Sequence, residues 1–260
     1  MIQRGAFTGK NFFWDYCFIF FRVSAPTDLK RLMRLFTISD SKLVFLKYFL
    51  FSKSILKQDL FVLNYVRSKM KSLGNEYFVE IGCADGKFSS NSYLFEKKFR
   101  WSGIIIEPGV KWFNDIKINR NCNFDNRFPI NSKGASMYYK EISLGKVSQN
   151  IFSYLYSDNP KIIDVPTTNS ITACSIMDIL GENNAPKFIE YLSIDMEGWE
   201  LEILEEIDFE IYSFGFITVE HNHVHKNRES VLRLLNSFGY RRVHEDLSFT
   251  DDWFENAYSK

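Results

Sequence analysis

The chain has 260 residues, of which 45% are hydrophobic and 25% are charged, and its formal net charge at pH 7 is zero. This length and composition allow a sizeable core within one elaborated domain, or within one domain that carries an appendage. Residues 1–75 contain 13 of the 32 Lys and Arg residues but only 4 of the 32 Asp and Glu residues, so residues 76–260 are acidic. An acidic body argues against a nucleic-acid enzyme, which is expected to have a basic groove near its catalytic loops.

The first part, residues 1–75, is predicted to be a basic, aromatic-rich helical segment. Its most apolar stretch, residues 11–23, is too short to span a bilayer and is interrupted by Asp15, so we interpret it as a packed or interfacial helix rather than a targeting segment. Further helices are predicted from Pro26, over 41–51 and over 59–73. Basic helices of this kind contact an anionic membrane surface, or they cap the body or mediate a homodimer, and both interpretations stay open.

The four cysteines are far apart, with no C-x-x-C pair and no histidine at zinc-ligand spacing. We interpret them as reduced thiols in a cytoplasmic protein.

A strand, a glycine turn, a helix and a second strand are predicted between residues 77 and 106. A β-rich apolar run at 77–81 precedes Gly82 and Gly86, a helix is expected over 91–99, and a second apolar run covers 104–106. This βαβ unit ends in Glu107, 21 positions after Gly86. An acidic residue at that distance can bind the two hydroxyls of a ribose.

The charge of the glycine loop indicates which nucleotide it binds. A dinucleotide loop holds a pyrophosphate at a helix N-terminus, where a carboxylate would repel it. Glu80 precedes this loop and Asp85 lies inside it, so the loop favours a cationic ligand. S-adenosylmethionine (SAM) has a ribose, a sulfonium and an ammonium but no phosphate, and we predict it as the cofactor. The alternative is that the two glycines only make a strand-to-helix turn in some other α/β protein.

The rest of the body alternates strands and helices. Helices are expected over 110–120, 175–180, 198–207 and 226–238, and extended segments or strands over 127–131, 134–141, 162–168, 189–195 and 214–220, with two final strands between 240 and 256. Residues 142–160 lack periodicity and are either a substrate lid or a surface insertion. The alternation predicts an α/β fold with a doubly wound, mostly parallel sheet.

Polar and acidic residues follow every predicted core strand, at the edge where such sheets bind ligands. In chain order they are Glu80 with the glycine loop, Glu107, Asn131, Asp195 with Glu197, and Glu220 with His221, Asn222 and His223. We therefore expect the active site at this edge.

Methyl transfer to a hydroxyl needs an aimed nucleophile and a group that accepts its proton or lowers its pKa. His221 and His223 are the candidate general bases, although they could equally be plain loop residues. Asp195 and Glu220, on strands about 4.8 Å apart, could instead hold Mg²⁺ or another divalent cation, with a carbonyl oxygen from Asn222. Asp195 and Glu197 could also simply cap the helix that follows them.

Several motifs resemble the FkbM-type SAM-dependent methyltransferase family. They are FVEIGCADGK at 78–87, GIIIEP at 103–108, PINSKG at 129–134, VPTTNSI at 165–171, YLSIDMEGWELEIL at 191–204 and ITVEHN at 217–222. The resemblance covers about residues 57–245. It implies a Rossmann-like class I methyltransferase fold and O-methylation, often of sugar or polyketide hydroxyls.

Carried over position by position, the resemblance implies that the glycine loop and Glu107 bind SAM, and that Asp195 and Glu197 lie by the transferred methyl. The cofactor-binding residues that we predict are Glu80, Gly82, Cys83, Ala84, Asp85, Gly86, Glu107, Pro108, Asn131 and Asp195. Two positions depart from the family, since Cys83 replaces a common Ala and Trp199 replaces a small residue. A bulky ring at 199 is expected to narrow the acceptor pocket.

We expect a cytoplasmic enzyme that methylates a hydroxyl of a sugar, in a nucleotide sugar or in a surface polysaccharide or glycoconjugate under synthesis. The alternatives are methylation of a non-sugar small molecule such as a polyketide, and a non-catalytic SAM-binding partner protein.

Overall fold

The computed structural model describes residues 31, 34, 48–70, 74–131, 137–139, 169–221 and 225–258. The predicted helix over 11–23, the non-periodic segment 142–160 and the extended segment 162–168 lie outside the described residues, and of the predicted helix over 41–51 only residues 48–51 are described. None of the helices in the described part of the chain has the length and apolar character needed to span a bilayer.

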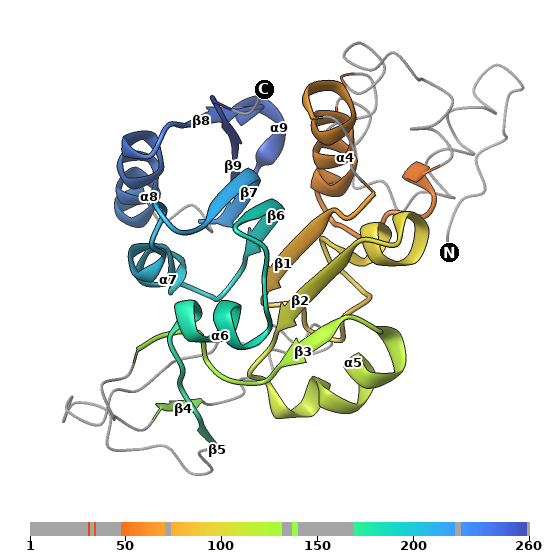
Figure 1. The fold of residues 1–260 in the computed structure, drawn as a ribbon, viewed down its shortest axis with the longest axis vertical. Helices are drawn as coiled ribbons and strands as arrows, with labels where there is room; N and C mark the ends of the chain where they lie inside the picture. Colours follow the sequence, from red (N-terminus) through yellow and green to blue (C-terminus); the bar gives the residue numbers. More distant parts are fainter. Residues whose placement is uncertain are drawn as a thin grey trace, which may run out of the picture.

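A seven-stranded sheet forms the centre of the fold, with the strand order β3-β2-β1-β6-β7-β9-β8 (Figure 1). Its strands are β1 (Tyr77–Ile81), β2 (Ser102–Ile106), β3 (Asn123–Asp125), β6 (Phe188–Ile194), β7 (Ser213–Glu220), β8 (Tyr240–Val243) and β9 (Asp251–Asn256). Strands β3, β2, β1, β6 and β7 are parallel, and β9 runs antiparallel to both of its neighbours. A separate antiparallel pair joins β4 (Met137–Tyr139) to β5 (Asn169–Ile171).

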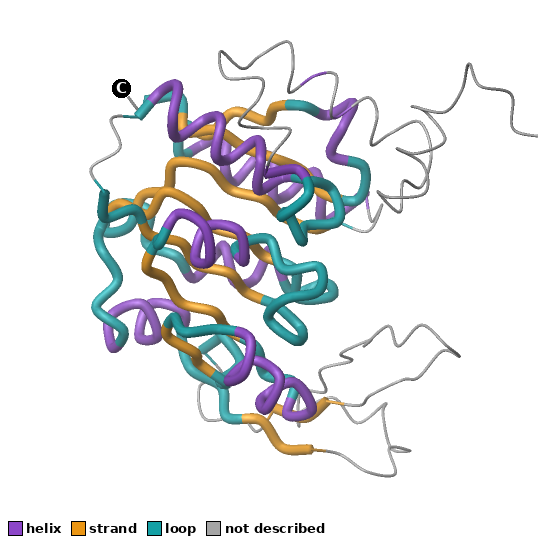
Figure 2. The backbone as a smooth tube through the Cα atoms, turned by 90° about the vertical axis from the view of Figure 1, so that its right-hand side faces the viewer, coloured by secondary structure: helices purple, strands orange, loops and turns teal. Residues whose placement is uncertain are grey.

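Helices cover both faces of this sheet (Figure 2). The helical elements are α4 (Gln58–Lys69), the π-helix η1 (Phe95–Phe99), the 3₁₀-helix η2 (Val110–Trp112), α5 (Phe113–Asn119), α6 (Ile176–Glu182), α7 (Glu200–Glu206), α8 (His225–Ser237) and α9 (Glu245–Ser248). Successive strand residues point to opposite faces. Accordingly, Val79 and Ile81 pack with α6, α7 and α8, whereas Phe78, which precedes Val79, packs with α4, η1 and α5.

This topology confirms the predicted doubly wound, Rossmann-like class I methyltransferase fold. The division of the chain at residue 75 stays a prediction, and α4, which precedes that boundary, shares a core cluster with Phe78 of β1 and Phe216 of β7. The two cores bury continuous apolar runs because a parallel sheet is covered on both sides.

One sequence prediction on the fold is wrong, and one element begins later than expected. Residues 127–131 are not the third strand, which is β3. Phe128 instead forms an isolated bridge with Ala173, and Pro129 has no N–H with which to continue a ladder. The helix expected over 91–99 is present but begins at Tyr93 and continues as the π-helix η1, since Ser90, Asn91 and Ser92 bind Glu80 ahead of its first turn.

Candidate active site

The parallel register aligns the carboxyl ends of the central strands. Gly82 N–H donates to Ile106 O at 2.9 Å, Asp195 N–H to Ile81 O at 2.9 Å, and Glu107 N–H to Asp125 O at 3.0 Å. The ladders therefore continue one residue past the strands, and they place the glycine loop beside Glu107 on one side and Asp195 on the other. The predicted site residues at the ends of β1, β2, β6 and β7 thus share one edge of the sheet.

Gly82 is required by the close approach of two chain segments. Its φ is +80°, and a Cβ atom built on it would lie 1.8 Å from the backbone oxygen of Asp195. Ala84, in the same loop, has a φ of 47°, which costs free energy for a residue with a side chain. The loop conformation is therefore held by its surroundings, in contact with the turn that follows β6.

Glu107 is buried, and its carboxylate accepts hydrogen bonds from the glycine loop. Its Oε2 accepts from Ala84 N–H at 2.9 Å, and its Oε1 accepts from Gly109 N–H at 2.8 Å. Loss of water raises the pKa of Glu107 to about 7, against the lowering effect of these N–H groups. Each oxygen keeps a second lone pair, so the carboxylate can still accept from ribose hydroxyls. Pro108, which follows Glu107, is also buried.

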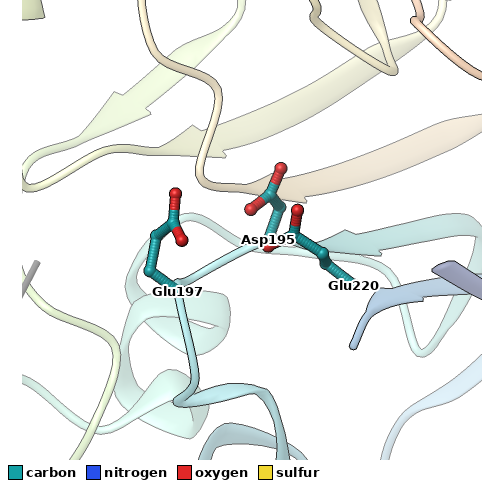
Figure 3. A group of neighbouring side chains, drawn as sticks. All are labelled: Asp195, Glu197 and Glu220. Carbon is teal, nitrogen blue, oxygen red and sulfur yellow. The ribbon is translucent and has the colours of Figure 1, made fainter. Parts of the chain in front are cut away.

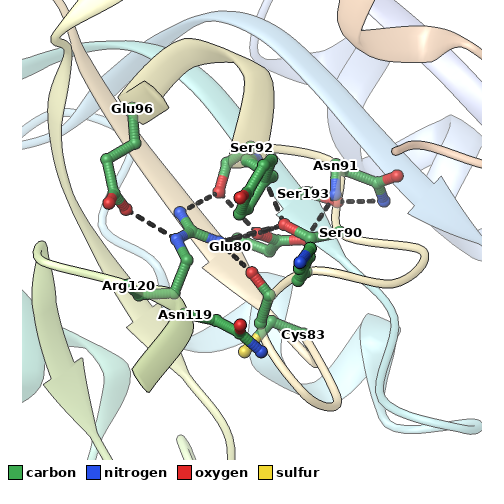
Figure 4. A network of polar contacts seen from close by, with 12 residues as sticks. Glu80, Cys83, Ser90, Asn91, Ser92, Glu96, Asn119, Arg120 and Ser193 are labelled. Carbon is green, nitrogen blue, oxygen red and sulfur yellow. Dashed lines mark hydrogen bonds and ion pairs between the residues drawn. The ribbon is translucent and has the colours of Figure 1, made fainter. Parts of the chain in front are cut away.

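Glu80 is fully engaged with protein donors (Figure 4). Its Oε2 accepts from the hydroxyl groups of Ser90 and Ser92, and its Oε1 accepts from Asn91 N–H at 2.6 Å. Arg120, from the end of α5, donates to Glu80, Ser90 and Ser92 and to Glu96 Oε2 at 2.6 Å. Glu80 thus fixes the segment after the glycine loop, and its oxygens are directed at the protein.

Asp85 also shapes the loop. Its Oδ1 accepts from Lys87 N–H at 2.8 Å and from Phe88 N–H at 2.6 Å, which closes a turn around the carboxylate. Cys83 is buried, and burial raises the pKa of its thiol well above the usual range, so it is an inert packing residue. Gly86 has a φ of +74°, and a Cβ there would lie 2.9 Å from the Arg120 side chain.

The turn after β6 carries the residues expected near the methyl group. Glu197 and Gly198 both have positive φ, at 51° and 105°. Glu200 holds this turn, because its Oε1 accepts from Met196 N–H at 2.9 Å and Gly198 N–H at 3.0 Å. Sequence reasoning missed Glu200, although its position three residues after Glu197, at the start of a helix, is a signal for a capping carboxylate.

Asp195, Glu197 and Glu220 form a group of carboxylates at the ends of β6 and β7 (Figure 3). One oxygen from each lies within 4.8 Å of the others. Figure 3 shows the side chains of Asp195 and Glu220 adjacent and that of Glu197 facing them. The Oε2 atom of Glu220 is buried and has no hydrogen-bond partner among the described residues.

Burial and mutual repulsion raise the pKa values of this group. Loss of water raises the pKa of Glu220, and the nearby Asp195 charge and the hydrogen bond between them raise it further. Loss of water also raises the pKa of Asp195, and it raises that of Glu197 to about 7 together with the charge of Asp195. Asp195 and Glu220 therefore hold protons more tightly than isolated carboxyl groups do, because two adjacent carboxylates cannot both ionise easily.

Asp251 adds a fourth carboxyl group that sequence reasoning missed. It pairs with Glu220 across β7 and β9, it is buried, and its Oδ2 accepts from the Gln58 amide at 3.1 Å. Burial and the charge of Asp195 raise its pKa to about 7. No local motif indicated it, because the antiparallel β7–β9 pairing brings it to the site from the end of the chain.

The predicted histidines are only partly described. His221 is buried, and its backbone N–H donates to the backbone oxygen of Thr250 at 2.8 Å. Its ring atom Nε2 lies 3.9 Å from Asp252 Oδ1. Asp252 also accepts a bidentate pair of hydrogen bonds from Arg228. His223 and Asn222 lie outside the described residues, so their roles as base and metal ligand stay predictions.

The contacts of Asn131 and Trp199 leave their predicted roles, in cofactor binding and in narrowing the acceptor pocket, as predictions. Asn131 is exposed and its N–H donates to Glu206 Oε1 at 2.6 Å, well beyond the end of β3, so its cofactor role stays a prediction. Trp199 packs edge-on against Phe128, with ring centroids 5.4 Å apart, in contact with the core.

A cavity of about 550 Å³ lies at the opposite edge of the sheet, lined by the first residues of β1, β2 and β3, and so is separate from the carboxylates.

A model of a protein family, described as the methyltransferase FkbM domain, matches residues 80–242 of this chain. No curated protein matches the chain in sequence. Solved structures similar to it include precorrin-6y C5,15-methyltransferase from Geobacter metallireducens GS-15, at 13% identity over 72% of both chains with a TM-score of 0.38. A human methyltransferase 10 domain containing protein has 12% identity over 78% of this chain and 81% of its own, with a TM-score of 0.42. A chain of a fibrillarin/Nop5p complex has 12% identity over 74% of this chain and 77% of its own, with a TM-score of 0.41.

Proposed function

This chain belongs to the FkbM methyltransferase family, and we propose that it transfers a methyl group from SAM to a hydroxyl of a sugar. The observation that carries the proposal is the group of carboxylates Asp195, Glu197 and Glu220, beside a glycine loop and the buried carboxylate of Glu107, to which we assign the ribose. Family membership implies SAM as the methyl donor, and SAM supplies an electrophilic methyl group on a sulfonium.

The charges at the site support a cationic cofactor. The glycine loop contacts Glu107 and the Asp195 backbone, and further carboxyl groups lie at the ends of β6, β7 and β9. Arg120, which donates to Gly86 O at 3.1 Å, is buried and engaged by Glu80 and Glu96. A phosphate-bearing nucleotide would meet repulsion here, whereas the ammonium and sulfonium of SAM would be attracted.

We assign proton acceptance to Glu197. A hydroxyl attacks an alkyl group well only if its proton is removed in the transition state, and a base whose pKa lies near 7 does this best at neutral pH. The pKa of Glu197 is raised to about 7. His221, which lies close to Asp252, is the alternative base, and His223 stays a second candidate.

A divalent cation such as Mg²⁺ is a further proposal for the same carboxylates. Asp195 and Glu220, with Glu197 in addition to the Asn222 predicted from sequence, would provide the hard oxygen ligands that Mg²⁺ prefers. The partnerless Glu220 Oε2 supports this proposal, because a cation would satisfy it.

The acceptor is proposed on the family resemblance, as a hydroxyl of a nucleotide sugar or of a growing surface polysaccharide or glycoconjugate. A polyketide hydroxyl is the alternative acceptor class. The pocket for either would lie over the carboxylates, since the hydroxyl must approach the methyl group in line with the sulfonium bond.

The test is calorimetric titration of the full chain with SAM and S-adenosylhomocysteine, beside the variants Glu107→Gln and, as a control, Glu205→Gln on the exposed side of α7. Glu107→Gln should weaken binding about 10- to 100-fold, because a charged hydrogen bond contributes about 1.5–3 kcal/mol, and Glu205→Gln should leave it unchanged. Absence of binding by the unmodified chain would overturn the proposal.

A screen of sugar and polyketide acceptors, with Mg²⁺ or with a chelator, then tests the finer assignments. Methylation of a sugar hydroxyl is expected. Full activity in the presence of chelator would show that methyl transfer needs no divalent cation. SAM binding without turnover of any acceptor would favour a non-catalytic SAM-binding protein.

A further inference from the structure

A group of exposed apolar side chains lies beside the segment that follows the glycine loop. Leu50, Phe51, Ile55 and Phe88 are between 41% and 65% exposed, and we call these four residues the apolar patch. Exposed apolar side chains that gather in one place, rather than singly, are a feature of interaction surfaces.

The local backbone holds these side chains outward. Between residues 51 and 56, Ser52, Ser54 and Leu56 are buried while the residues between them are exposed, which is the alternation of an extended chain. The inward side chains are anchored, since the Ser52 hydroxyl donates to Asp59 Oδ1 at 2.8 Å and the Ser54 hydroxyl donates to Gln58. These hydrogen bonds hold the backbone so that the side chains of Phe51 and Ile55 stay exposed.

Contacts between distant segments bring the patch together. Ser54 forms a parallel bridge with Ser89, which places Phe88 next to the 51–55 segment. Phe51 lies against η1, because Lys98 Nζ is 4.0 Å from the centre of its ring. Three stretches that are separate in sequence thus contribute to one surface.

Lysines surround the patch. Lys53, Lys87 and Lys98 are exposed, and residues 48–57 contain no Asp or Glu. Two of these lysines, Lys87 and Lys98, come from residues 76–260, which are acidic in composition. Apolar side chains interleaved with lysines are the composition of a surface that inserts into the headgroup region of an anionic bilayer.

We propose that the apolar patch and its lysines dock the protein on the surface of a membrane rich in anionic lipid. Charge complementarity selects this occupant. A second copy of the patch would bring lysines against lysines, and residues 1–47 of the same chain are basic too, with 8 Lys and Arg against 3 Asp. Docking here would hold the loop that contains Gly82 and Gly86 near the membrane, where a lipid-linked saccharide would be presented.

The test is co-sedimentation of the full chain with vesicles of phosphatidylglycerol and phosphatidylcholine, beside vesicles of phosphatidylcholine alone. No cofactor or acceptor is needed, so the result is independent of the proposed methyl transfer. The patch variant is Phe51→Ser, Ile55→Ser and Phe88→Ser. The control variant is Ile118→Ser, Ile211→Ser and Phe249→Ser, which removes side chains that are 43–80% exposed elsewhere.

We expect the unmodified chain to bind the anionic vesicles, and the patch variant to lose at least about tenfold in its partition coefficient, while the control changes less than about twofold. Binding should also fall as salt is raised, because exposed charges are screened. Thermal melting confirms that both variants are folded. No binding to anionic vesicles, equal binding to neutral ones, or full binding by the patch variant would each overturn the proposal. So would a dimer in sedimentation velocity that the patch variant abolishes.

Discussion

Gly82 is the residue on which the geometry of the site depends most directly. Because Gly82 has no side chain, the glycine loop can touch the backbone of Asp195 in the turn that follows β6. Ala84 and Glu197, on either side of this contact, both have positive φ. Strained residues of this kind persist only where the surroundings hold them, and they concentrate at functional sites.

Gly82→Ala is predicted to destabilise the protein strongly, by about 3 kcal/mol or more, because the new Cβ would clash with a backbone oxygen and adopt an unfavourable φ. Gly181→Ala is the control. Gly181 lies in α6 with no atom within 4 Å of a new Cβ, and alanine there should stabilise the helix by about 0.5–1 kcal/mol. Chemical denaturation measures both. A stable Gly82→Ala variant would refute the close contact.

A second prediction at this scale concerns Glu197 and pH. Its pKa is raised to about 7, so Glu197 is protonated below that pH. Only above that pH can it take the proton from the substrate hydroxyl. The rate of methyl transfer should therefore rise with pH through about 7. In Glu197→Gln the rise should disappear and the rate fall about 10²- to 10⁴-fold, which is the usual contribution of a general base. Steady-state kinetics from pH 5 to 9 are the measurement. An unchanged inflection in the variant would assign the base to another group.

At the scale of elements, the local sequence pattern predicts a strand or helix correctly where the apolar residues of that element alone determine its conformation. The apolar runs of β1, β2, β6 and β7 and the helix α8 are where the sequence predicts them, because each buries a continuous or periodic apolar set. The positions of Glu107, Asp195 and Glu220 at one edge followed from those strands. The parallel topology brings these residues to the same edge, because the carboxyl ends of parallel strands lie together.

The failures lie where tertiary contacts override local preference. The predicted helix begins only at Tyr93, because Ser90, Asn91 and Ser92 before it donate hydrogen bonds to buried Glu80. Likewise Phe128 is β-prone, yet it pairs with the remote Ala173 rather than with β2. Neither partner is visible in a sequence window, and Asp251 reaches the site by the same kind of long-range pairing.

The network between the glycine loop and α5 gives the prediction for this scale. Arg120 is buried with Glu80 and Glu96, and Arg120 together with their other partners holds the pKa of Glu96 down to about 2, against the raising effect of burial. Arg120→Met would leave the Glu80 charge buried without its cation, so a loss of about 3–5 kcal/mol in stability is expected. Arg241→Met is the control, because Arg241 is an exposed partner of Glu255 at 3.6 Å and should cost less than about 1 kcal/mol. Equal losses in urea denaturation would contradict the role of this network.

At the scale of the whole molecule, stability and function make opposite demands on the carboxyl edge. The two apolar cores on either side of the sheet hold the chain folded. The edge gathers Glu107, Asp195, Glu220 and Asp251, in places where water is excluded and like charges are close. The carboxyl edge that we propose for a cationic cofactor thus destabilises the folded chain when no cation offsets its charges.

The final prediction follows from the sign of those pKa shifts. Burial raises the pKa of Glu107 and of Asp251 to about 7, and it raises those of Asp195 and Glu220 as well. Between about pH 4.5 and 7 the folded protein therefore retains protons that the unfolded chain has released, so the free energy of unfolding falls as pH rises through this window. Half-buried His244, whose pKa is lowered by partial loss of water, acts in the opposite sense but is a single group.

The melting temperature should consequently be lower at pH 8 than at pH 5.5, by roughly 2–4 °C for each kcal/mol lost in a chain of this size. Saturating SAM should reduce the difference, because its cationic groups stabilise the ionised carboxylates and ligand binding adds to the stability of the folded state. Glu220→Gln removes one of the unfavourable ionisations and should flatten the dependence, whereas Glu205→Gln, on exposed α7 surface, should leave it as it is. Calorimetric scans across this pH range are the measurement. A melting temperature that rises from pH 5.5 to 8 would mean that these carboxyl groups are already ionised and compensated in the folded protein, and that the edge is not held ready for a cation.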